Sequence, residues 1–279
     1  MKDKLTKPLY GTDEWAIIED QFDEITNVED ETIFSLGNGY IGMRGNLEEG
    51  FSGKQGRTVN GTYINAFYES EPIHYPEGAY GYARNSQTMI NVTNGKIIEL
   101  YVDGERFDLL SGKLLAYKRT LDLRQGVLLR EMTWQSSAGR TVDIRIRRLV
   151  SLARKHIAAI EYEVKPVNFS GTLELISRLD GAVRNQVAAD DPRVGSALAG
   201  QVLTTVEQSC RETCGMLRQQ TKHTRFTIVT GMEHTVHPAA ACRIEAGGEG
   251  DQLFVRFTFD AREGETVGIT KFLTYHTSK

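Results

Sequence analysis

Apolar and polar residues alternate with a period of two along most of this chain. Arg145 alone separates Ile144 from Ile146, and single polar residues separate Ile160, Tyr162 and Val164. Successive side chains of a β-strand point to opposite faces, so this spacing is typical of strands with one buried face. The same reasoning predicts strands at Val127–Trp134, Thr141–Arg147, His156–Val164, Thr172–Ile176, Phe226–Thr230, Gln252–Phe259 and Val267–Tyr275.

Turn dipeptides separate several of these runs. Within Thr88–Leu109, Asn94-Gly95 and Asp103-Gly104 each lie between apolar runs. Both central residues of a type I′ turn need positive φ, which Asn-Gly and Asp-Gly tolerate, so each dipeptide is predicted to close a hairpin.

Helical periodicity is scarce. Leu198–Lys222 has partial helical spacing, but Gly215 interrupts it, and we expect strand and loop there. Asn185–Gly200 and Ser70–Asn85 are expected to be long surface loops. The pattern as a whole predicts an all-β fold, a large antiparallel β-sandwich of roughly 15–20 strands that occupies residues 1–279 as a single domain.

Glu31–Gly50 contains a glycine pattern that resembles a nucleotide-binding loop. Gly37, Gly39 and Gly42 spell G-x-G-x-x-G after a strand-like run, Thr32–Leu36. The dinucleotide fingerprint also needs a following helix and an acidic residue about 20 positions later. The next residues are too rich in glycine for a helix, and no acid follows at that distance. We therefore interpret the segment as a β-turn with Tyr40 and Ile41 packed inward.

Composition narrows the function classes. The chain carries 33 basic and 37 acidic residues that are mixed along its length, so neither nucleic acid nor a membrane is an expected partner. No apolar run approaches the ~20 residues that span a bilayer, and the N-terminus has no apolar core of a signal peptide. Three cysteines do not suggest a disulfide framework. We expect a cytoplasmic protein.

Several short motifs together resemble one family. They are SLGNGYIGMRGNLEEG at Ser35–Gly50, the segment Gly61–Tyr68, Val102–Glu105 and Arg147–Leu152. As a set, they resemble the N-terminal domain of glycoside hydrolase family 65, the family of maltose, trehalose, kojibiose and nigerose phosphorylases. The resemblance runs from about Trp15 to Lys279. It implies a large β-sandwich that precedes a catalytic helical barrel, and nothing in these 279 residues is similar to that barrel.

The resemblance implies that catalysis lies outside this segment. Glycosidic cleavage needs a carboxylic acid to protonate the leaving oxygen. In the inverting phosphorylases one Glu does so while inorganic phosphate, a co-substrate, attacks the opposite face. The family places that acid and the phosphate ligands in the barrel, so no catalytic residue is expected here. We accordingly interpret Glu48-Glu49, Glu161 with Glu163, and Asp190-Asp191 as non-catalytic carboxylates.

One loop could contact sugar. Pro72–Tyr82 carries three tyrosines, a histidine and a carboxylate, and long loops carry function more often than strands do. The substrate-rim candidates are His74, Tyr75, Glu77, Tyr80 and Tyr82. The resemblance implies that a loop of this domain approaches the active-site mouth, whereas packing on the sandwich or on a neighbouring domain is the alternative.

Arg44 is a candidate for anion binding, because arginine favours bidentate contact with phosphate or carboxylate. Its alternative role is to anchor a turn through carbonyl oxygens or a nearby acid. Cys210 with Cys214 and His234 with His237 miss zinc-finger spacings, so no metal site and no cofactor are expected.

The expected role is therefore architectural. The domain would brace its own C-terminal helical barrel, lend a loop to the rim of the active site, and aid homodimer formation. The parent reaction would convert an α-glucosyl disaccharide and phosphate into β-glucose 1-phosphate and a sugar. A carbohydrate-binding module and a plain interaction domain are alternatives from other classes, and the parent could be a hydrolase such as a trehalase.

Overall fold

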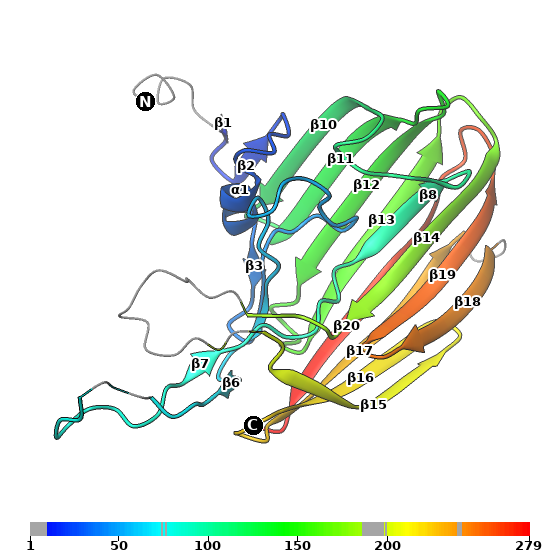
Figure 1. Ribbon diagram of the computed structural model, residues 1–279. Helices are drawn as coiled ribbons and strands as arrows, with labels where there is room; N and C mark the ends of the chain where they lie inside the picture. Colours follow the sequence, from blue (N-terminus) through cyan, green and yellow to red (C-terminus); the bar gives the residue numbers. More distant parts are fainter. Residues whose placement is uncertain (1–9, 74, 76, 186–197, 199, 239–241) are drawn as a thin grey trace.

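Two antiparallel sheets packed face to face make up most of the molecule (Figure 1). The computed structural model describes residues 10–73, 75, 77–185, 198, 200–238 and 242–279. The predicted all-β sandwich is confirmed, with 20 strands and one helix, α1 (Asn27–Ile33), in this part of the chain. None of the helices described has the length and apolar character that crossing a membrane requires.

The large sheet has ten strands. In spatial order they are β1 (Gly11–Thr12), β2 (Ala16–Glu19), β10 (Lys113–Asp122), β11 (Val127–Gln135), β12 (Thr141–Val150), β13 (Ile157–Pro166), β20 (Val267–Thr277), β17 (Thr227–His237), β16 (Cys214–Thr221) and β15 (Leu203–Arg211).

The small sheet has five strands, and two short ribbons lie beside the sandwich. The five strands are β18 (Cys242–Glu249), β19 (Gln252–Ala261), β14 (Gly171–Asp180), β8 (Ile98–Val102) and β9 (Glu105–Arg106). The ribbons pair β3 (Leu36–Gly37), β4 (Ile41–Met43) and β5 (Thr62–Ile64), and β6 (Tyr68–Glu69) with β7 (Thr88–Met89).

The core lies between the inner faces of the two sheets. Ile146 of β12 is directly opposite Tyr162 of β13, and both are almost fully buried. Leu175 of β14 and Phe257 of β19 pair in the same way across the small sheet. Each fully buried side chain of this size contributes about 1.5–3 kcal/mol, so the alternation seen in the sequence supplies the main stabilisation.

The two predicted hairpin turns have different outcomes. Asp103 and Gly104 adopt φ of 46° and 84° and connect β8 to β9, as predicted. The prediction for Asn94-Gly95 is wrong: neither residue has positive φ, and the backbone of Asn94 exchanges two hydrogen bonds with Asp180. A side chain at Gly95 would collide with Leu273, so this glycine allows a close approach between layers and does not make a turn.

The other local predictions also have mixed outcomes. The strand-like reading of Thr32–Leu36 is wrong except at Leu36, because α1 continues to Ile33 and β3 begins only at Leu36. Tertiary contacts hold this short helix: the Tyr10 hydroxyl donates to the Asp30 carboxylate at 2.5 Å. Leu198–Lys222 contains β15 and β16, as expected. Most of the predicted loop Asn185–Gly200 lies outside the described residues.

The glycine pattern makes the expected β-turn. Gly39 has φ of 86°, and β3 and β4 flank it as a hairpin. Ile41 is buried, and the rings of Tyr40 and His156 pack edge to face with their centroids 4.6 Å apart. The Asn38 amide donates to the carbonyl of Ser151 at 2.7 Å, so this turn is fastened to the end of β12.

A buried ionic cluster fastens the rest of this N-terminal segment to the large sheet. The Glu48 carboxylate accepts hydrogen bonds from Arg148 and, at 2.6 Å, from Arg130, while Glu49 pairs with Arg130 at 2.7 Å. All four side chains are about 1% exposed. Burial by itself would raise the pKa of the Glu48 carboxyl, but Arg148 and Arg130 outweigh it and lower the pKa to about 2.

Two buried lysines add links to the small sheet and to the short ribbon. Lys271 of β20 donates from Nζ to the carbonyl oxygen of Arg178 in β14 at 2.7 Å. Lys96 donates to the hydroxyl of Thr62 in β5 at 2.7 Å. Burial lowers the pKa of both ammonium groups well below its usual value. Their carbonyl and hydroxyl partners satisfy donors that would otherwise be costly to bury.

We predict that Glu48→Gln lowers the free energy of unfolding by about 3–5 kcal/mol, because it leaves Arg148 and Arg130 without a full counter-charge in the interior. Guanidinium unfolding followed by circular dichroism measures the change. Glu163→Gln, at an exposed ion pair, is the matched control and should change stability by less than about 1 kcal/mol. Equal effects of the two substitutions would contradict a structural role for the cluster.

We also predict a specific pH dependence. The folded state lowers the pKa of Glu48 from 4.5 to about 2, so its contribution is complete above pH 4.5 and is lost as the pH falls towards 2. At 1.36 kcal/mol per pH unit this loss is about 3 kcal/mol. Denaturant titrations at several pH values should show a steeper acid loss in the wild-type chain than in Glu48→Gln. Parallel pH profiles would count against the assignment.

Candidate functional site

The loop that the sequence singled out is an extended ribbon that projects from one lower corner of the sandwich (Figure 1). We call residues 70–87 the tyrosine arm. Its two limbs start at β6 and β7, and Pro72 bridges to Asn85 further out. The amide of Ile73 donates to the carbonyl of Arg84 at 2.9 Å, so the two limbs remain paired beyond the bridge. The arm is therefore a paired ribbon at its base and reaches away from the core.

The arm presents its tyrosines to solvent. The rings of Tyr75 and Tyr82 lie 4.8 Å apart, tilted by 49°, and are 43% and 54% exposed. Tyr80 is fully exposed, and Glu77 is exposed as well. Three exposed rings on one ribbon can stack on sugar or on another protein surface. Of the five rim candidates, His74 lies outside the described residues.

The base of the arm is clamped by one carboxylate. Glu69, almost fully buried, accepts hydrogen bonds from the backbone N–H groups of His223 and Thr224, each at 2.8 Å, and of Ser70 at 2.9 Å. Burial raises the pKa of this carboxyl, but the three backbone donors outweigh burial and lower it. The clamp ties the base of the arm, at β6, to the turn between β16 and β17.

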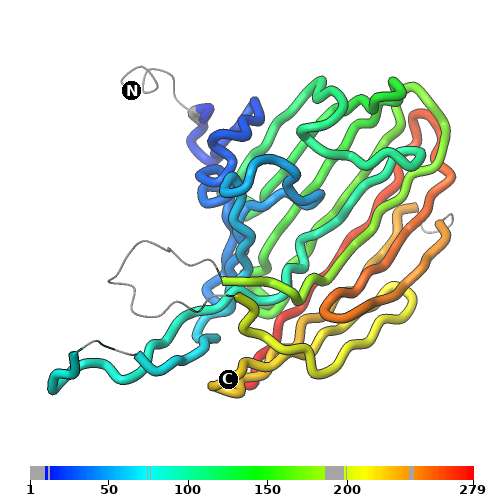
Figure 2. The backbone as a smooth tube through the Cα atoms, in the orientation of Figure 1, coloured from blue at the N-terminus to red at the C-terminus, as the bar shows by residue number. Residues whose placement is uncertain are grey.

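The C-terminal residue lies beside this base (Figure 2). The Lys279 ammonium is 4.1 Å from the ring centre of Tyr68, and the Phe226 ring meets Tyr68 edge-on at 5.3 Å. A hollow of about 450 Å³ adjoins them, lined by Ser70, Pro72, Asn85, His223 and Thr224.

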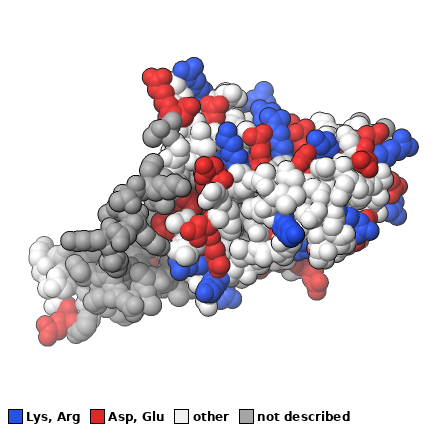
Figure 3. Space-filling model, turned by 90° about the horizontal axis from the view of Figure 1, so that it is seen from above, with Lys and Arg blue, Asp and Glu red and all other residues white. Residues whose placement is uncertain are grey.

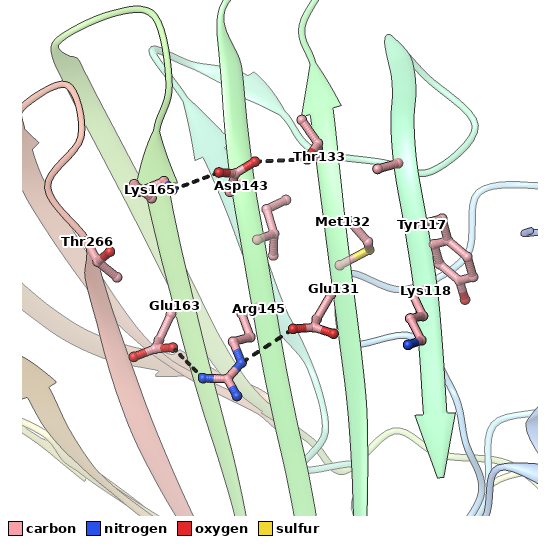
Figure 4. A pocket seen from close by; sticks show the side chains of 12 residues that line it. Tyr117, Lys118, Glu131, Met132, Thr133, Asp143, Arg145, Glu163, Lys165 and Thr266 are labelled. Atoms are coloured by element: carbon pink, nitrogen blue, oxygen red, sulfur yellow. Dashed lines mark hydrogen bonds and ion pairs between the residues drawn. The ribbon is translucent and has the colours of Figure 1, made fainter. Parts of the chain in front are cut away.

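A second hollow, of about 460 Å³, lies on the outer face of the large sheet (Figure 4). Arg145 points between Glu131 and Glu163 and is 3.8 Å from each carboxylate. Asp143 pairs with Lys165 at 3.0 Å. These opposite charges are cross-strand neighbours that neutralise one another, so the hollow contains no isolated acid of the kind that protonates a leaving group.

The other carboxylates that the sequence offered are also structural where the structure describes them. Glu48 and Glu49 belong to the buried cluster, and Glu161 pairs with Arg147 at 3.2 Å on the outer face, as expected for a solvent-facing strand residue. Asp190 and Asp191 lie outside the described residues. Glu19 has a raised pKa because it is buried, but its carboxylate accepts from Tyr117 and Arg119 in the interior.

Arg44 uses its guanidinium within the fold. Its Nε donates to the carbonyl of Val59 and one Nη donates to that of Val28, both at 2.9 Å. Glu31 lies 3.7 Å away. These contacts support the turn-anchoring alternative, and anion binding at Arg44 stays a prediction.

Metal binding has no support among the described residues, which include no cluster of three potential ligands. The cysteines are free, and Cys210 and Cys214 lie on opposite faces of their hairpin.

Basic and acidic side chains are interspersed on the face seen from above (Figure 3).

Sequence reasoning missed the arginines that hold the fold together. Arg130 follows the inner-face spacing of Leu128, Met132 and Trp134, so a charge at an apolar position was the available signal. Arg148 occupies the same kind of position after Ile144 and Ile146 in β12. A charge in such a position needs a buried partner, and the pair Glu48-Glu49 supplies it.

Comparison with known proteins identifies relatives over the whole chain. Residues 17–279 match the N-terminal domain of glycosyl hydrolase family 65. The α,α-trehalose phosphorylase of Thermoanaerobacter brockii is 44% identical over 279 residues, which are all of this chain and 36% of that protein. The kojibiose phosphorylase of the same organism is 29% identical over 97% of this chain and 33% of its own length.

A solved structure agrees on the fold. A putative kojibiose phosphorylase from the human microbiome superposes with a TM-score of 0.84 at 23% identity, over 96% of this chain and 33% of that one. The chain thus spans about a third of the length of the relatives it matches. By its match over nearly all residues, the chain belongs to glycosyl hydrolase family 65, as the N-terminal domain of that family.

Proposed function

We propose that this chain is the non-catalytic N-terminal domain of an inverting α-glucoside phosphorylase. The parent enzyme would convert a disaccharide and inorganic phosphate into β-glucose 1-phosphate and a released sugar. One observation carries the proposal: a trehalose phosphorylase is 44% identical over the entire chain, although the chain covers only 36% of it. α,α-Trehalose is therefore the first disaccharide to test.

The side chains of this domain support a role without chemistry. An inverting phosphorolysis needs one carboxylic acid to protonate the leaving oxygen while phosphate attacks the anomeric carbon from the opposite face. The carboxylates of the outer hollow are paired with Arg145 or Lys165. In the interior, Glu48, Glu49 and Glu19 are paired with Arg130, Arg148 or Arg119, and Glu69 accepts backbone hydrogen bonds. The acid and the phosphate ligands would come from polypeptide outside this domain.

The tyrosine arm gives the domain a second role. Because the clamp at Glu69 fixes its base, the arm can hold Tyr75, Tyr80 and Tyr82 at a constant distance from the sandwich. In the parent enzyme we place these rings at the rim of the active site, where they would guide or cover the sugar. The domain would also brace the catalytic domain and contribute to a homodimer.

A carbohydrate-binding module is the second candidate, and the exposed Tyr75–Tyr82 pair favours it. Flat, exposed aromatic faces suit the C–H surface of a sugar ring. This candidate predicts saturable binding by the chain alone, which calorimetry with trehalose, maltose and kojibiose tests.

We predict that the 279-residue chain, incubated with phosphate and trehalose, maltose, kojibiose or nigerose, releases no glucose 1-phosphate above the blank. A coupled assay for glucose 1-phosphate measures it, with the trehalose phosphorylase of Thermoanaerobacter brockii and trehalose as the positive control. Product formation in proportion to the amount of the short chain would refute the non-catalytic assignment.

We further predict that replacing both Tyr75 and Tyr82 by Ala leaves the unfolding free energy of the chain within about 0.5 kcal/mol, because the rings are exposed. In the parent enzyme, the same change should lower kcat/KM for the disaccharide about tenfold or more, which steady-state kinetics measures. Leu115→Ala, at an exposed apolar position away from the arm, should change neither quantity. Unaltered kinetics in the double variant would remove the arm from the rim.

A further inference from the structure

The outer face of the large sheet has two unlike halves. In one half, cross-strand neighbours carry charges: Lys118, Glu131, Arg145 and Glu163 lie directly opposite one another in adjacent strands. This is the usual surface of an antiparallel sheet that has one face in water.

The other half breaks this rule. Leu149 of β12, Ala159 of β13 and Phe272 of β20 are successive partners in one cross-strand row. Leu149 and Phe272 are 37% and 40% exposed, while their neighbours Leu273 and Ala158 point inward and are fully buried. The apolar residues therefore face outward by position and are not core residues that fray into solvent.

Adjacent rows extend this surface. Ile157 and Met216 lie in the next row, separated by Thr274 and Gly231, and Ser209 of β15 follows Met216. Val229 follows one row further on. We call the six apolar residues of these rows the apolar half-face: Leu149, Ile157, Ala159, Met216, Val229 and Phe272.

The shape of the half-face is that of a contact surface. Phe272 lies between Ala159 on β13 and Glu233 on β17, and the small residues Thr274 and Gly231 lie in the next row. A ring that projects from a low surface is a common anchor in an interface, and contiguous exposed apolar area marks a place that another element covers. Sheet faces of this kind are buried against helices or a second sheet.

We infer that the apolar half-face is the docking surface for the polypeptide that follows this domain in the parent enzyme, through a helical segment with an apolar face. This inference rests on the proposed function. The trehalose phosphorylase relative carries 64% of its length outside the matched part, and the match is to an N-terminal domain. Phe272 lies on β20, the last strand of the matched residues, so the polypeptide that follows would continue from the strand that carries Phe272.

A native thiol reports on this surface. Cys214 of β16 is exposed and continues the row of Phe272 through Glu233 of β17. A segment docked on the half-face would shield this thiol. Cys210 and Cys242 are partly buried and point to the inner face, so they serve as internal references.

The test compares maleimide labelling of Cys214, followed by peptide mass spectrometry, in the 279-residue chain and in the complete enzyme. We expect labelling at least tenfold slower in the complete enzyme, with Cys210 and Cys242 changed much less. Phe272→Glu in the complete enzyme should restore labelling to within about threefold of the rate in the short chain. Lys118→Glu, which adds the same charge to the charged half, should leave Cys214 protected.

The outcomes separate the two levels of the argument. Equal labelling in the short chain and in an active complete enzyme overturns the docking inference and leaves the proposed function standing. Protection of the short chain that grows with its concentration assigns the surface to a second copy and also overturns the inference. A complete polypeptide that does not phosphorolyse any α-glucosyl disaccharide overturns the proposed function, whatever the state of Cys214.

Discussion

The Glu48 carboxylate, held between the guanidinium groups of Arg130 and Arg148, is the contact on which the rest of the architecture depends. Without these partners the buried Glu48 carboxyl would be protonated or displaced towards solvent. Without Glu48, the two buried arginines would keep uncompensated charges, which would destabilise the fold more strongly. Because Glu48 belongs to the N-terminal segment and the arginines to β11 and β12, the N-terminal segment, its glycine turn and the strands β3–β5 are held against one edge of the sandwich. The same logic recurs where Glu19 meets Arg119.

Much of the fold could be predicted because burial acts on every second residue. Alternation located the long strands, and Asp103-Gly104 located a turn, since both signals are local. The turn predicted at Asn94-Gly95 was wrong because a contact with a residue distant in sequence decides the role of this dipeptide. Gly95 lies against Leu273, and no local pattern reveals that approach. The sequence did not predict helix α1 for a related reason. Its seven residues are held by tertiary partners such as Tyr10 and have little helical preference of their own.

The candidate site was predictable as a loop but not as a position. Prolines, glycines and tyrosines identified residues 70–87, yet only the structure shows that the rings stand clear of the sandwich. The apolar half-face was visible only after register was known, because Leu149, Ala159 and Phe272 are far apart in sequence and become neighbours through pairing. The relatives extend well beyond this domain, and the tyrosine arm and the apolar half-face are the surfaces that we propose for contact with such an extension.

The clamp at Glu69 is made mainly of main-chain N–H groups, and the side chains of His223 and Thr224 add hydrogen bonds to the carbonyls of Ser70 and Tyr68. A proline at residue 223 or 224 would remove one of the main-chain donors, because proline has no N–H to donate. The outer tip of the arm takes no part in these contacts, so substitutions there leave the base unchanged. Evolution could therefore change what the tip of the arm contacts, from one substrate to another, while Glu69 continues to hold the base of the arm.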